Sequence, residues 1–340
     1  MRDLAARWML HGVTAVDSSR RRFLRRATAF TALALTGGCA SESSQAKAIG
    51  NRGDKSRPTA AIIDTHTHFY DPKRREGVPW PPKGDPILYR TVLPEEYRQL
   101  AQPLGITGTV VVEASPRVED NQWVLDLATQ EPFLRGLIGH LDPGTPTFRD
   151  LLNRFHKNNR FKGIRIGVWD PKTQFNRAEV IADLQAVADM GLVVDVLVSP
   201  AQLLSVADLA DKLPSLPLVI DHCANVTIDG KEPSPIWTTG IQALARRHNV
   251  HMKVSGLVEG TGKSDGNAPG DTGYYLPVLN TLWNTFGPDR LIFGSNWPVS
   301  SRFAPLSTVK GLVTEYFRSH GEEASQSYFA GNAQRVYRWG

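Results

Sequence analysis

Cysteine is scarce in this sequence: its 340 residues include two, Cys39 and Cys223. Only Cys223 lies in the part of the chain that resembles a folded protein in composition, so no intrachain disulfide framework is available there. Long apolar runs are lacking as well, because the apolar stretch at residues 27–35 is shorter than the roughly 20 residues that span a bilayer. Heptad patterns and internal repeats are also absent, which argues against a filament or a repeat protein.

An excess of positive charge is missing from most of the chain. The formal net charge is +5, but residues 1–40 hold seven arginines against Asp3 and Asp17 and therefore account for all of it. The rest of the chain is close to neutral. Because nucleic-acid binding usually requires a basic surface, we expect no nucleic-acid partner.

The first 40 residues have the organisation of an export signal. Residues 19–25 read Ser-Arg-Arg-Arg-Phe-Leu-Arg, which matches the twin-arginine pattern, and the weakly apolar run follows directly. Residues 36–40, Thr-Gly-Gly-Cys-Ala, are similar to a bacterial lipoprotein cleavage box. Lipidation of Cys39, plain signal cleavage and no processing all remain open. We expect an exported protein that is either periplasmic or tethered to the membrane through Cys39.

The remainder of the chain divides into a short connecting segment and one large domain. Residues 41–59 are polar and lack periodicity, so they are expected to form a flexible tether. Residues 60–340 show no Pro- or Gly-rich linker that would split them. A composition of 41% hydrophobic and 21% charged residues is ordinary for a globular domain of this size.

Short β-branched runs alternate with longer amphipathic stretches from residue 60 onward. We predict strands at residues 61–64, 108–113, 134–141, 161–166, 193–198, 218–221, 251–254 and 291–293. Helices are predicted at residues 121–130, 148–157, 177–190, 201–212, 236–247, 275–286 and 306–320. Continuous apolar strands that alternate with helices indicate a parallel sheet covered by helices.

Eight such units favour a closed (β/α)8 barrel, the TIM barrel, over an open doubly wound sheet. The open sheet would need a Gly-rich phosphate-binding turn after its first strand, and the first strand here ends in histidines instead. Residues 256–273, rich in Gly, Asp, Ser and Thr, are predicted to form a long loop after the seventh strand. Loops at that end of a barrel usually shape the active site.

Two histidines follow the first predicted strand directly. Residues 62–68 read Ile-Ile-Asp-Thr-His-Thr-His, an apolar strand that runs into His66 and His68. In an extended segment alternate side chains point to one face, so these imidazoles should project together, roughly 7 Å apart. The spacing predicts a paired-imidazole site for one ion or one substrate. The alternative is a strand end with two surface histidines.

Polar residues end most of the other predicted strands too. In a barrel the carboxyl ends of the strands meet at one mouth, where the active sites of barrel enzymes lie. The residues concerned are His66, His68, Glu113, His140, Asp142, Arg165, His222, Lys253, Ser255 and Asn296. A direct role is expected first for the histidines at positions 66, 68 and 222 and for Arg165. The residues His140, Asp142 and Lys253 also have purely structural interpretations.

Seven short motifs follow one another along the folded part of the chain. They are Asp-Thr-His-Thr-His at 64–68, Trp-Pro at 80–81, Lys-Gly-Ile-Arg at 162–165, Val-Ile-Asp-His at 219–222, Lys-Val-Ser-Gly-Leu at 253–257, Gly-Pro-Asp-Arg-Leu-Ile-Phe-Gly-Ser-Asn-Trp-Pro-Val at 287–299 and Asn-Ala at 332–333. Taken together these motifs resemble the amidohydrolase superfamily, and within it the lactonase-like amidohydrolase 2 group. That group includes sugar lactonases, dicarboxylate and muconolactone-type lactonases and, more distantly, metal-dependent decarboxylases.

The resemblance implies a barrel hydrolase with a small-molecule substrate, in which water attacks the ester carbonyl of a sugar- or dicarboxylate-type lactone. The histidines at positions 66, 68 and 222 would supply the framework for metal binding or proton transfer. Arg165 would stabilise carboxylate or oxyanion charge, and Asn296 would position the water or the substrate. Glu113, Lys253, Trp80 and Trp297 are further candidates for substrate binding, the two tryptophans by stacking on a ring.

The sequence departs from the group at one position that matters for catalysis. The usual motif after the eighth strand is Gly-Ser-Asp-Trp-Pro, whose aspartate is the general base, and this chain has Asn296 there. A primary amide has no useful basicity near neutral pH. The residues at positions 66, 68 and 222 could still hold one divalent metal, most simply zinc, with a fourth position open. In binuclear members of the superfamily, a carboxylated lysine at the end of the fourth strand bridges the two metals. Because no lysine clearly ends the fourth strand here, the resemblance implies no more than one metal.

Two other accounts of the site remain open. In one, no metal binds, a histidine acts as the base, and Arg165 and Lys253 hold the substrate. In the other, the barrel binds a periplasmic ligand and has lost hydrolysis. The enzyme alternative to a lactonase is a decarboxylase of the same superfamily, which would release CO₂. The identity of the lactone and the oligomeric state are not determined by the sequence.

Overall fold

The computed structural model describes residues 61–167 and 174–339. The expected export signal (1–40), the expected tether (41–59) and Cys39 lie outside the described residues, so these predictions stay predictions. Within the described part of the chain, no helix has both the length and the apolar character needed to cross a membrane.

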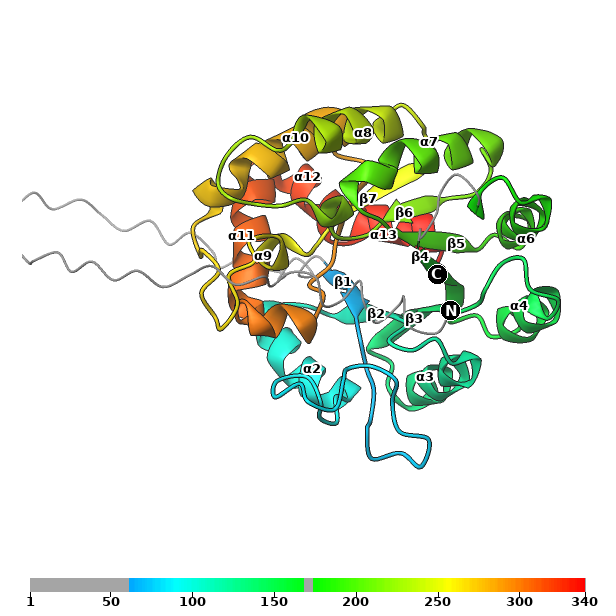
Figure 1. Ribbon diagram of the computed structural model, residues 1–340. Coiled ribbons are helices and arrows are strands. Elements are labelled where there is room, and N and C mark those ends of the chain that lie inside the picture. Colours follow the sequence, from blue (N-terminus) through cyan, green and yellow to red (C-terminus); the bar gives the residue numbers. More distant parts are fainter. Residues whose placement is uncertain (1–60, 168–173, 340) are drawn as a thin grey trace, which may run out of the picture. The chain divides into compact units, whose positions relative to one another are not determined.

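Eight parallel strands form one sheet in which each strand pairs with the next along the chain (Figure 1). The strands are β1 (Ile63–Thr67), β2 (Gly108–Val112), β3 (Leu134–Gly139), β4 (Phe161–Gly167), β5 (Val193–Leu197), β6 (Leu218–Ile220), β7 (Val250–Val254) and β8 (Leu291–Phe293). The segment after β8 returns to β1 through a parallel bridge between Thr67 and Trp297, where His68 N donates to Trp297 O at 2.9 Å. The sheet thus curls into a ring, and the predicted (β/α)8 barrel is confirmed.

Helices lie between the strands and cover the outside of the barrel (Figure 1). The α-helices are α2 (Pro94–Ala101), α3 (Val118–Gln130), α4 (Phe148–His156), α6 (Ala178–Asp189), α7 (Leu203–Lys212), α8 (Pro235–Ala245), α9 (Leu257–Gly260), α10 (Leu276–Phe286), α11 (Leu306–Ser319), α12 (Glu322–Gln326) and α13 (Asn332–Tyr337). Short single turns are η1 (Gln102–Leu104), η2 (Pro200–Gln202), η3 (His222–Asn225), η4 (Thr272–Tyr275), η5 (Val299–Arg302) and the π-type η6 (Ser327–Gly331). The seven predicted helices are found close to their predicted limits, while α2, α9, α12 and α13 were not predicted. Helix α9 is a single turn within residues 256–273, which were predicted to form a loop.

The sequence of α8 illustrates how a covering helix is set. Ser234 precedes it and its side chain accepts from Trp237 N, and Pro235 occupies the first helical position, where its missing N–H costs nothing. The buried residues of this helix, Trp237, Gly240, Ile241 and Leu244, recur at helical spacing and form one apolar stripe. A Cβ at Gly240 would lie 2.5 Å from Leu203 Cβ, so glycine permits the close approach of α8 to α7.

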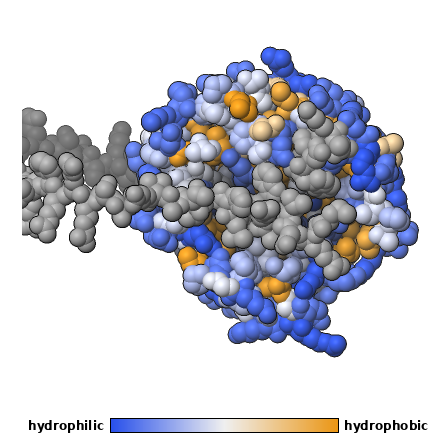
Figure 2. Space-filling model, viewed as in Figure 1, coloured by the Kyte–Doolittle hydropathy of each residue, from blue (hydrophilic) through white to orange (hydrophobic). Residues whose placement is uncertain are grey.

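Apolar side chains from the strands fill the barrel interior. One cluster combines Ile63, Val110, Val112, Ile138, Val193, Val219 and Ile292 with Ala333, Val336 and Tyr337 of α13. Because Ile63 and Val193 begin their strands, α13 packs at the amino end of the barrel and the carboxyl end is left for polar groups. On the face shown in Figure 2, the described surface is largely hydrophilic with scattered hydrophobic patches.

Candidate active site

Strand β1 is buried at every position and brings His66 and His68 to the carboxyl end of the barrel. The Asp64 carboxylate ties this strand to the segment after β8, because its Oδ1 accepts from His66 N at 3.0 Å and from Ser295 N at 2.8 Å. The register with β2 shifts between Asp64 and Thr67. The two imidazole rings lie with their centroids 5.0 Å apart, closer than the spacing expected of a regular strand.

His68 is held so that its Nε2 atom is available to the site. Its Nδ1 lies 3.0 Å from the Val112 carbonyl oxygen, which can only accept, so Nδ1 carries the proton and donates. Burial lowers the pKa of His68 to about 4, which leaves the ring neutral near pH 7. Nε2 therefore carries a lone pair, and it lies 3.2 Å from Asn296 Oδ1.

The donor atoms of His66, Asp221 and His222 all lie within 4.8 Å of one another. His66 Nε2 is buried and has no hydrogen-bond partner. His222 Nδ1 lies 2.9 Å from Ser255 Oγ. Burial lowers the pKa of His222 to about 3 and that of His66 well below its usual value, so both imidazoles are neutral and can bind a cation through a lone pair. This donor set fits a divalent metal ion.

The backbone turns sharply at the end of β6 to present His222. Four successive residues, His222, Cys223, Ala224 and Asn225, have φ between 49° and 58°, in the left-handed region that non-glycine residues seldom adopt. Trp237 Nε1 donates to Cys223 O at 2.8 Å, and Asn225 Nδ2 donates to Val198 O at 2.7 Å. These bonds hold an unfavourable turn in place, as is common at functional sites.

A buried cation, the Lys253 ammonium, lies beside this cluster. Its Nζ is 2.5 Å from Asp195 Oδ2, 3.1 Å from Asp221 Oδ1 and 3.3 Å from His66 Nδ1. Lys253, Asp195 and Asp221 are each 0% exposed, and the Tyr337 hydroxyl donates to Asp195 Oδ1 at 3.1 Å. Lys253 is therefore a buried, paired ammonium, and an interpretation of it as a solvent-exposed lysine without a role in the site is wrong.

Burial and the ammonium act in opposite directions on the two carboxylates. Burial raises the pKa of Asp195 to about 6 although Lys253 opposes the shift. Burial also favours the neutral form of Asp221, but the charge of Lys253 and a hydrogen bond from His66 hold the pKa of that carboxyl well below its usual value. Asp221 is thus the carboxylate of the cluster that stays ionised.

Arg165 and Glu113 form an ion pair at the end of strands β4 and β2. The guanidinium donates from Nε to Glu113 Oε1 at 2.8 Å and from Nη2 to the Glu113 carbonyl oxygen at 3.0 Å. The side chains are 6% and 14% exposed, respectively. The two predicted binding residues are therefore brought together as a largely desolvated pair.

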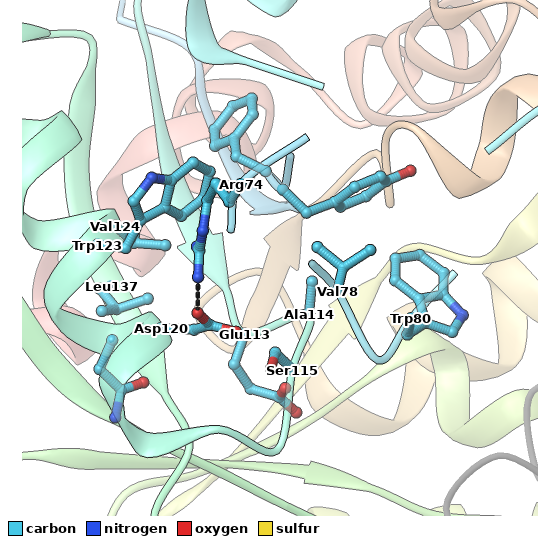
Figure 3. Close-up of a pocket in the computed structure, with 13 residues that line it drawn as sticks. Arg74, Val78, Trp80, Glu113, Ala114, Ser115, Asp120, Trp123, Val124 and Leu137 are labelled. Atoms are coloured by element: carbon cyan, nitrogen blue, oxygen red, sulfur yellow. Dashed lines mark hydrogen bonds and ion pairs between the residues drawn. The ribbon is translucent and has the colours of Figure 1, made fainter. Parts of the chain in front are cut away.

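An aromatic pocket adjoins His68. The Trp80 ring centroid lies 5.8 Å from that of His68 and 5.3 Å from that of Tyr70. Trp80, Val78, Glu113 and Trp123 help to line the pocket, and Arg74 pairs with Asp120 within it (Figure 3). The pocket thus joins a flat apolar surface to the Arg165 and Glu113 pair.

Trp297 has a different position. It is 2% exposed, and its ring packs 6.1 Å from Phe69 and 5.1 Å from Tyr97 between centroids. The structure gives this residue a packing role, and contact with a substrate stays a prediction. His140 also stands apart from the histidine cluster, with its Nε2 at 3.3 Å from Asp142 Oδ1.

Asn296 adopts a left-handed conformation, with φ of 58°, just after β8. Its Oδ1 faces His68, and its Nδ2 donates to Glu259 Oε1 at 2.8 Å. A Cβ at the neighbouring Gly294 would lie 2.9 Å from His66 Cβ and 3.2 Å from Lys253 Cγ. Glycine at position 294 therefore lets the segment after β8 approach the cluster.

Three residues of the site were not among the predicted ones. Asp221 precedes His222 in a quoted motif, and its carboxyl group could have been inferred from that position. Asp195 interrupts the apolar run of β5, and a charge in a buried strand is a recognisable signal. Glu259 lies in the polar segment after β7, and no pattern in the sequence distinguishes it from its neighbours.

Comparison with known proteins agrees with this arrangement. A family model described as amidohydrolase matches residues 63–339. The chain is 30% identical over 282 residues to an L-fucono-1,5-lactonase of Burkholderia ambifaria, which covers 81% of this chain and 95% of that protein. It is 27% identical over 256 residues to a 4-sulfomuconolactone hydrolase of Rhizobium radiobacter, covering 71% and 77%, respectively.

A solved structure has the same fold. It is an amidohydrolase from Burkholderia multivorans with bound zinc, and the two chains are 25% identical with a TM-score of 0.74. The match covers 83% of this chain and 100% of the other.

Proposed function

This chain belongs to the amidohydrolase family, and on that basis we propose that it hydrolyses the ester bond of a lactone of the sugar or dicarboxylate type. Two relatives named as lactone hydrolases support this substrate class. The structural observation that carries the proposal is the neutral Nε2 of His68, which lies 3.2 Å from Asn296 Oδ1 at the barrel mouth.

His68 performs the proton transfer in this proposal. Its lone pair on Nε2 accepts a proton from water as the water attacks the lactone carbonyl, and its Nδ1–H keeps the ring oriented through Val112 O. Asn296 Oδ1 accepts the second hydrogen of the same water and so fixes its direction. An amide is suited to this task, because orienting a water molecule requires an acceptor and no basicity.

One divalent metal ion would be held by His66, Asp221 and His222. Such an ion, for which zinc is the candidate, polarises a carbonyl and lowers the pKa of water. The donor atoms lie within 4.8 Å of one another, and His66 Nε2 has no other partner, which supports the assignment. Participation of His68 in metal binding stays a prediction, as does a metal-independent site with His68 alone as base.

The remaining predicted residues define where the substrate lies. Arg165, oriented by Glu113, faces the carboxylate or developing oxyanion of the substrate. Trp80 provides the flat surface for the lactone ring. Lys253 supports the site indirectly, because its ammonium is paired with the carboxylates of Asp195 and Asp221.

Export of this hydrolase is part of the proposal. The arginines of residues 19–25 would direct it to the twin-arginine route, and Cys39 would anchor a lipidated form. A protein retained in the cytoplasm at its full length would contradict this assignment.

The test is a panel of lactones followed by acid release, together with elemental analysis of zinc in the same protein. We expect turnover by the wild type and a loss of at least about 100-fold in kcat for His68→Ala, the range of general-base catalysis. His320→Ala is the control, because this histidine lies at the end of α11 and stacks on Trp283 away from the mouth. Release of CO₂ without acid would identify a decarboxylase, and binding without turnover would identify a ligand-binding barrel.

A further inference from the structure

Glu259 is the buried carboxyl group that the proposed reaction leaves without a role. It lies in α9, which starts after Gly256, a residue with φ of 67°. A Cβ at Gly260 would lie 2.8 Å from Val226 O, so α9 packs closely on the segment that follows η3. This packing places Glu259 beside the segment that follows β8.

The partners of Glu259 are unusual for a buried acid. Oε1 accepts from Asn296 Nδ2 at 2.8 Å, while Oε2 is buried without a hydrogen-bond partner. Among residues 61–167 and 174–339, no lysine, arginine or histidine forms an ion pair with it. A buried carboxylate that is stabilised by one side-chain amide and its own backbone N–H, with no cation beside it, is poorly stabilised in its charged form.

The other titratable groups that face Glu259 are neutral near pH 7. These are the Cys223 thiol of η3, whose pKa burial raises to about 12, and the Tyr275 phenol of η4, whose pKa burial also raises. Burial raises the pKa of Glu259 itself to about 7, so this carboxyl is the group in the neighbourhood that titrates at neutral pH.

The protonation state of Glu259 determines which end of the Asn296 amide faces His68. An ionised carboxylate only accepts, so it takes the amide N–H₂ and leaves Oδ1 directed at His68 Nε2. A protonated carboxyl can donate to Oδ1, and the reversed amide then donates its N–H₂ to the lone pair of Nε2. The side chain of Asn296 is symmetric enough in shape for both orientations.

We propose that Glu259 is a positioning residue that sets the orientation of the Asn296 amide and thereby switches the water-binding acceptor pair of the site on and off. The proposal rests on the lactonase function given above. With Glu259 ionised, His68 Nε2 and Asn296 Oδ1 are two acceptors 3.2 Å apart, and one water molecule can donate a hydrogen to each. With Glu259 protonated, the amide N–H occupies Nε2 and the pair no longer exists.

Activity should increase with pH in this proposal. The active orientation requires the ionised carboxyl, so kcat should rise as the pH increases through the pKa of Glu259 at about 7. Glu259→Gln removes this ionisation while keeping the size of the side chain. Because a glutamine can donate or accept at any pH, both amide orientations of Asn296 are then populated at every pH.

The experiment compares pH profiles of lactone hydrolysis for the full-length wild type and Glu259→Gln. We expect the rise of kcat near pH 7 to disappear in the variant. Because part of the molecules then have the reversed amide, kcat at pH 8.5 should be lowered at least about twofold, with KM nearly unchanged. The double variant Glu259→Gln with Asn296→Asp exchanges amide and carboxyl, and it should recover activity because the carboxylate then faces the water directly. If kcat of Glu259→Gln still rises near pH 7 as in the wild type, the proposal is wrong.

Glu315→Gln is the matched control. Glu315 accepts from Thr272 Oγ1 at 2.6 Å, so it also holds the segment after β7, but it does so from α11 and has no contact with Asn296. This substitution should leave the pH profile as in the wild type. If the rise of kcat near pH 7 were lost in the control as well, the effect would come from disturbance of the loop and the ionisation of Glu259 would not be its cause.

A readout without turnover separates this proposal from the proposed function. The side-chain amide signals of Asn296, assigned by their loss in Asn296→Asp, should shift in nitrogen-15 NMR with a midpoint near pH 7 in the wild type and stay constant in Glu259→Gln. If no lactone is hydrolysed but the signals titrate, the lactonase function is wrong and the positioning role stands. If lactones are hydrolysed and the signals do not titrate, the positioning role is wrong.

Discussion

The Lys253 ammonium offers a direct test of how charge is balanced inside this barrel. It is 0% exposed and lies 2.5 Å from Asp195 Oδ2 and 3.1 Å from Asp221 Oδ1. Lys253→Met replaces the ammonium with an uncharged chain of similar volume. The change leaves two buried carboxylates without a cation, and each loses a Coulomb attraction of roughly 5 to 7 kcal/mol at an effective dielectric constant of 20.

The net loss of stability is smaller than the lost attraction, because the variant no longer has to bury an ammonium. Breaking a buried ion pair by removing one partner typically costs about 3 to 5 kcal/mol, and we expect that decrease in the free energy of unfolding at pH 7.5. For a domain of this size the melting temperature should fall by about 6 to 20 °C.

The decrease in the free energy of unfolding caused by Lys253→Met should also depend on pH. Burial already raises the pKa of Asp195 to about 6 with Lys253 present, and without the ammonium the pKa values of both Asp195 and Asp221 rise further. An acid whose pKa is raised by folding destabilises the protein above that pKa and ceases to do so once it is protonated. The difference between variant and wild type should therefore shrink as the pH falls from 7.5 to 5.

Denaturant unfolding followed by tryptophan fluorescence measures this difference. Arg154→Met is the control, because the Arg154 and Glu119 side chains are 43% and 72% exposed and such surface pairs contribute under about 1 kcal/mol. Addition of Asp195→Asn to Lys253→Met should recover part of the loss. A Lys253→Met variant within about 1 kcal/mol of the wild type at pH 7.5 would refute the reasoning, since the carboxylates would not then need the cation.

Three further outcomes follow from packing and burial. In Gly163→Ala the new Cβ would lie 2.0 Å from Val193 O, so we expect the free energy of unfolding to fall by about 3 kcal/mol or more. Gly311 lies in α11 and a Cβ there would have nothing within 4 Å, so Gly311→Ala should raise the free energy of unfolding by about 0.5 to 1 kcal/mol. Equal stabilities of the two variants in denaturant unfolding would contradict this. Cys223, 1% exposed and with its pKa raised to about 12, should resist alkylation in the folded protein and react after denaturation, as mass spectrometry of its peptide would show. Trp80→Ala should raise KM for a ring lactone about tenfold with little change in kcat, measured by initial rates, and an unchanged KM would remove this ring from substrate binding.

The order of secondary structure follows from the sequence because local patterns carry it. The strands of this barrel are short apolar runs, and the helices between them show one apolar stripe each, so both types were predicted within a few residues of their limits. The strand-end positions of His66, His68 and His222 were also predictable, since a parallel barrel brings the carboxyl ends of its strands together whatever the intervening residues are. Helix α13 was not predicted, because it covers the amino end of the barrel and no local sequence pattern indicates that position.

The sequence by itself determined the barrel, the family resemblance and the histidines at its mouth, because these depend on periodicity and on short motifs. Tertiary structure alone decided how the charges are balanced. Lys253 and Asp195 are 58 residues apart in the chain, and Asn296 and Glu259 are separated by 37. No local rule relates such positions, since their distance is set by how the strands and loops close around the barrel. The tautomer of His68, the burial of Glu259 and the orientation of the Asn296 amide all follow from that closure.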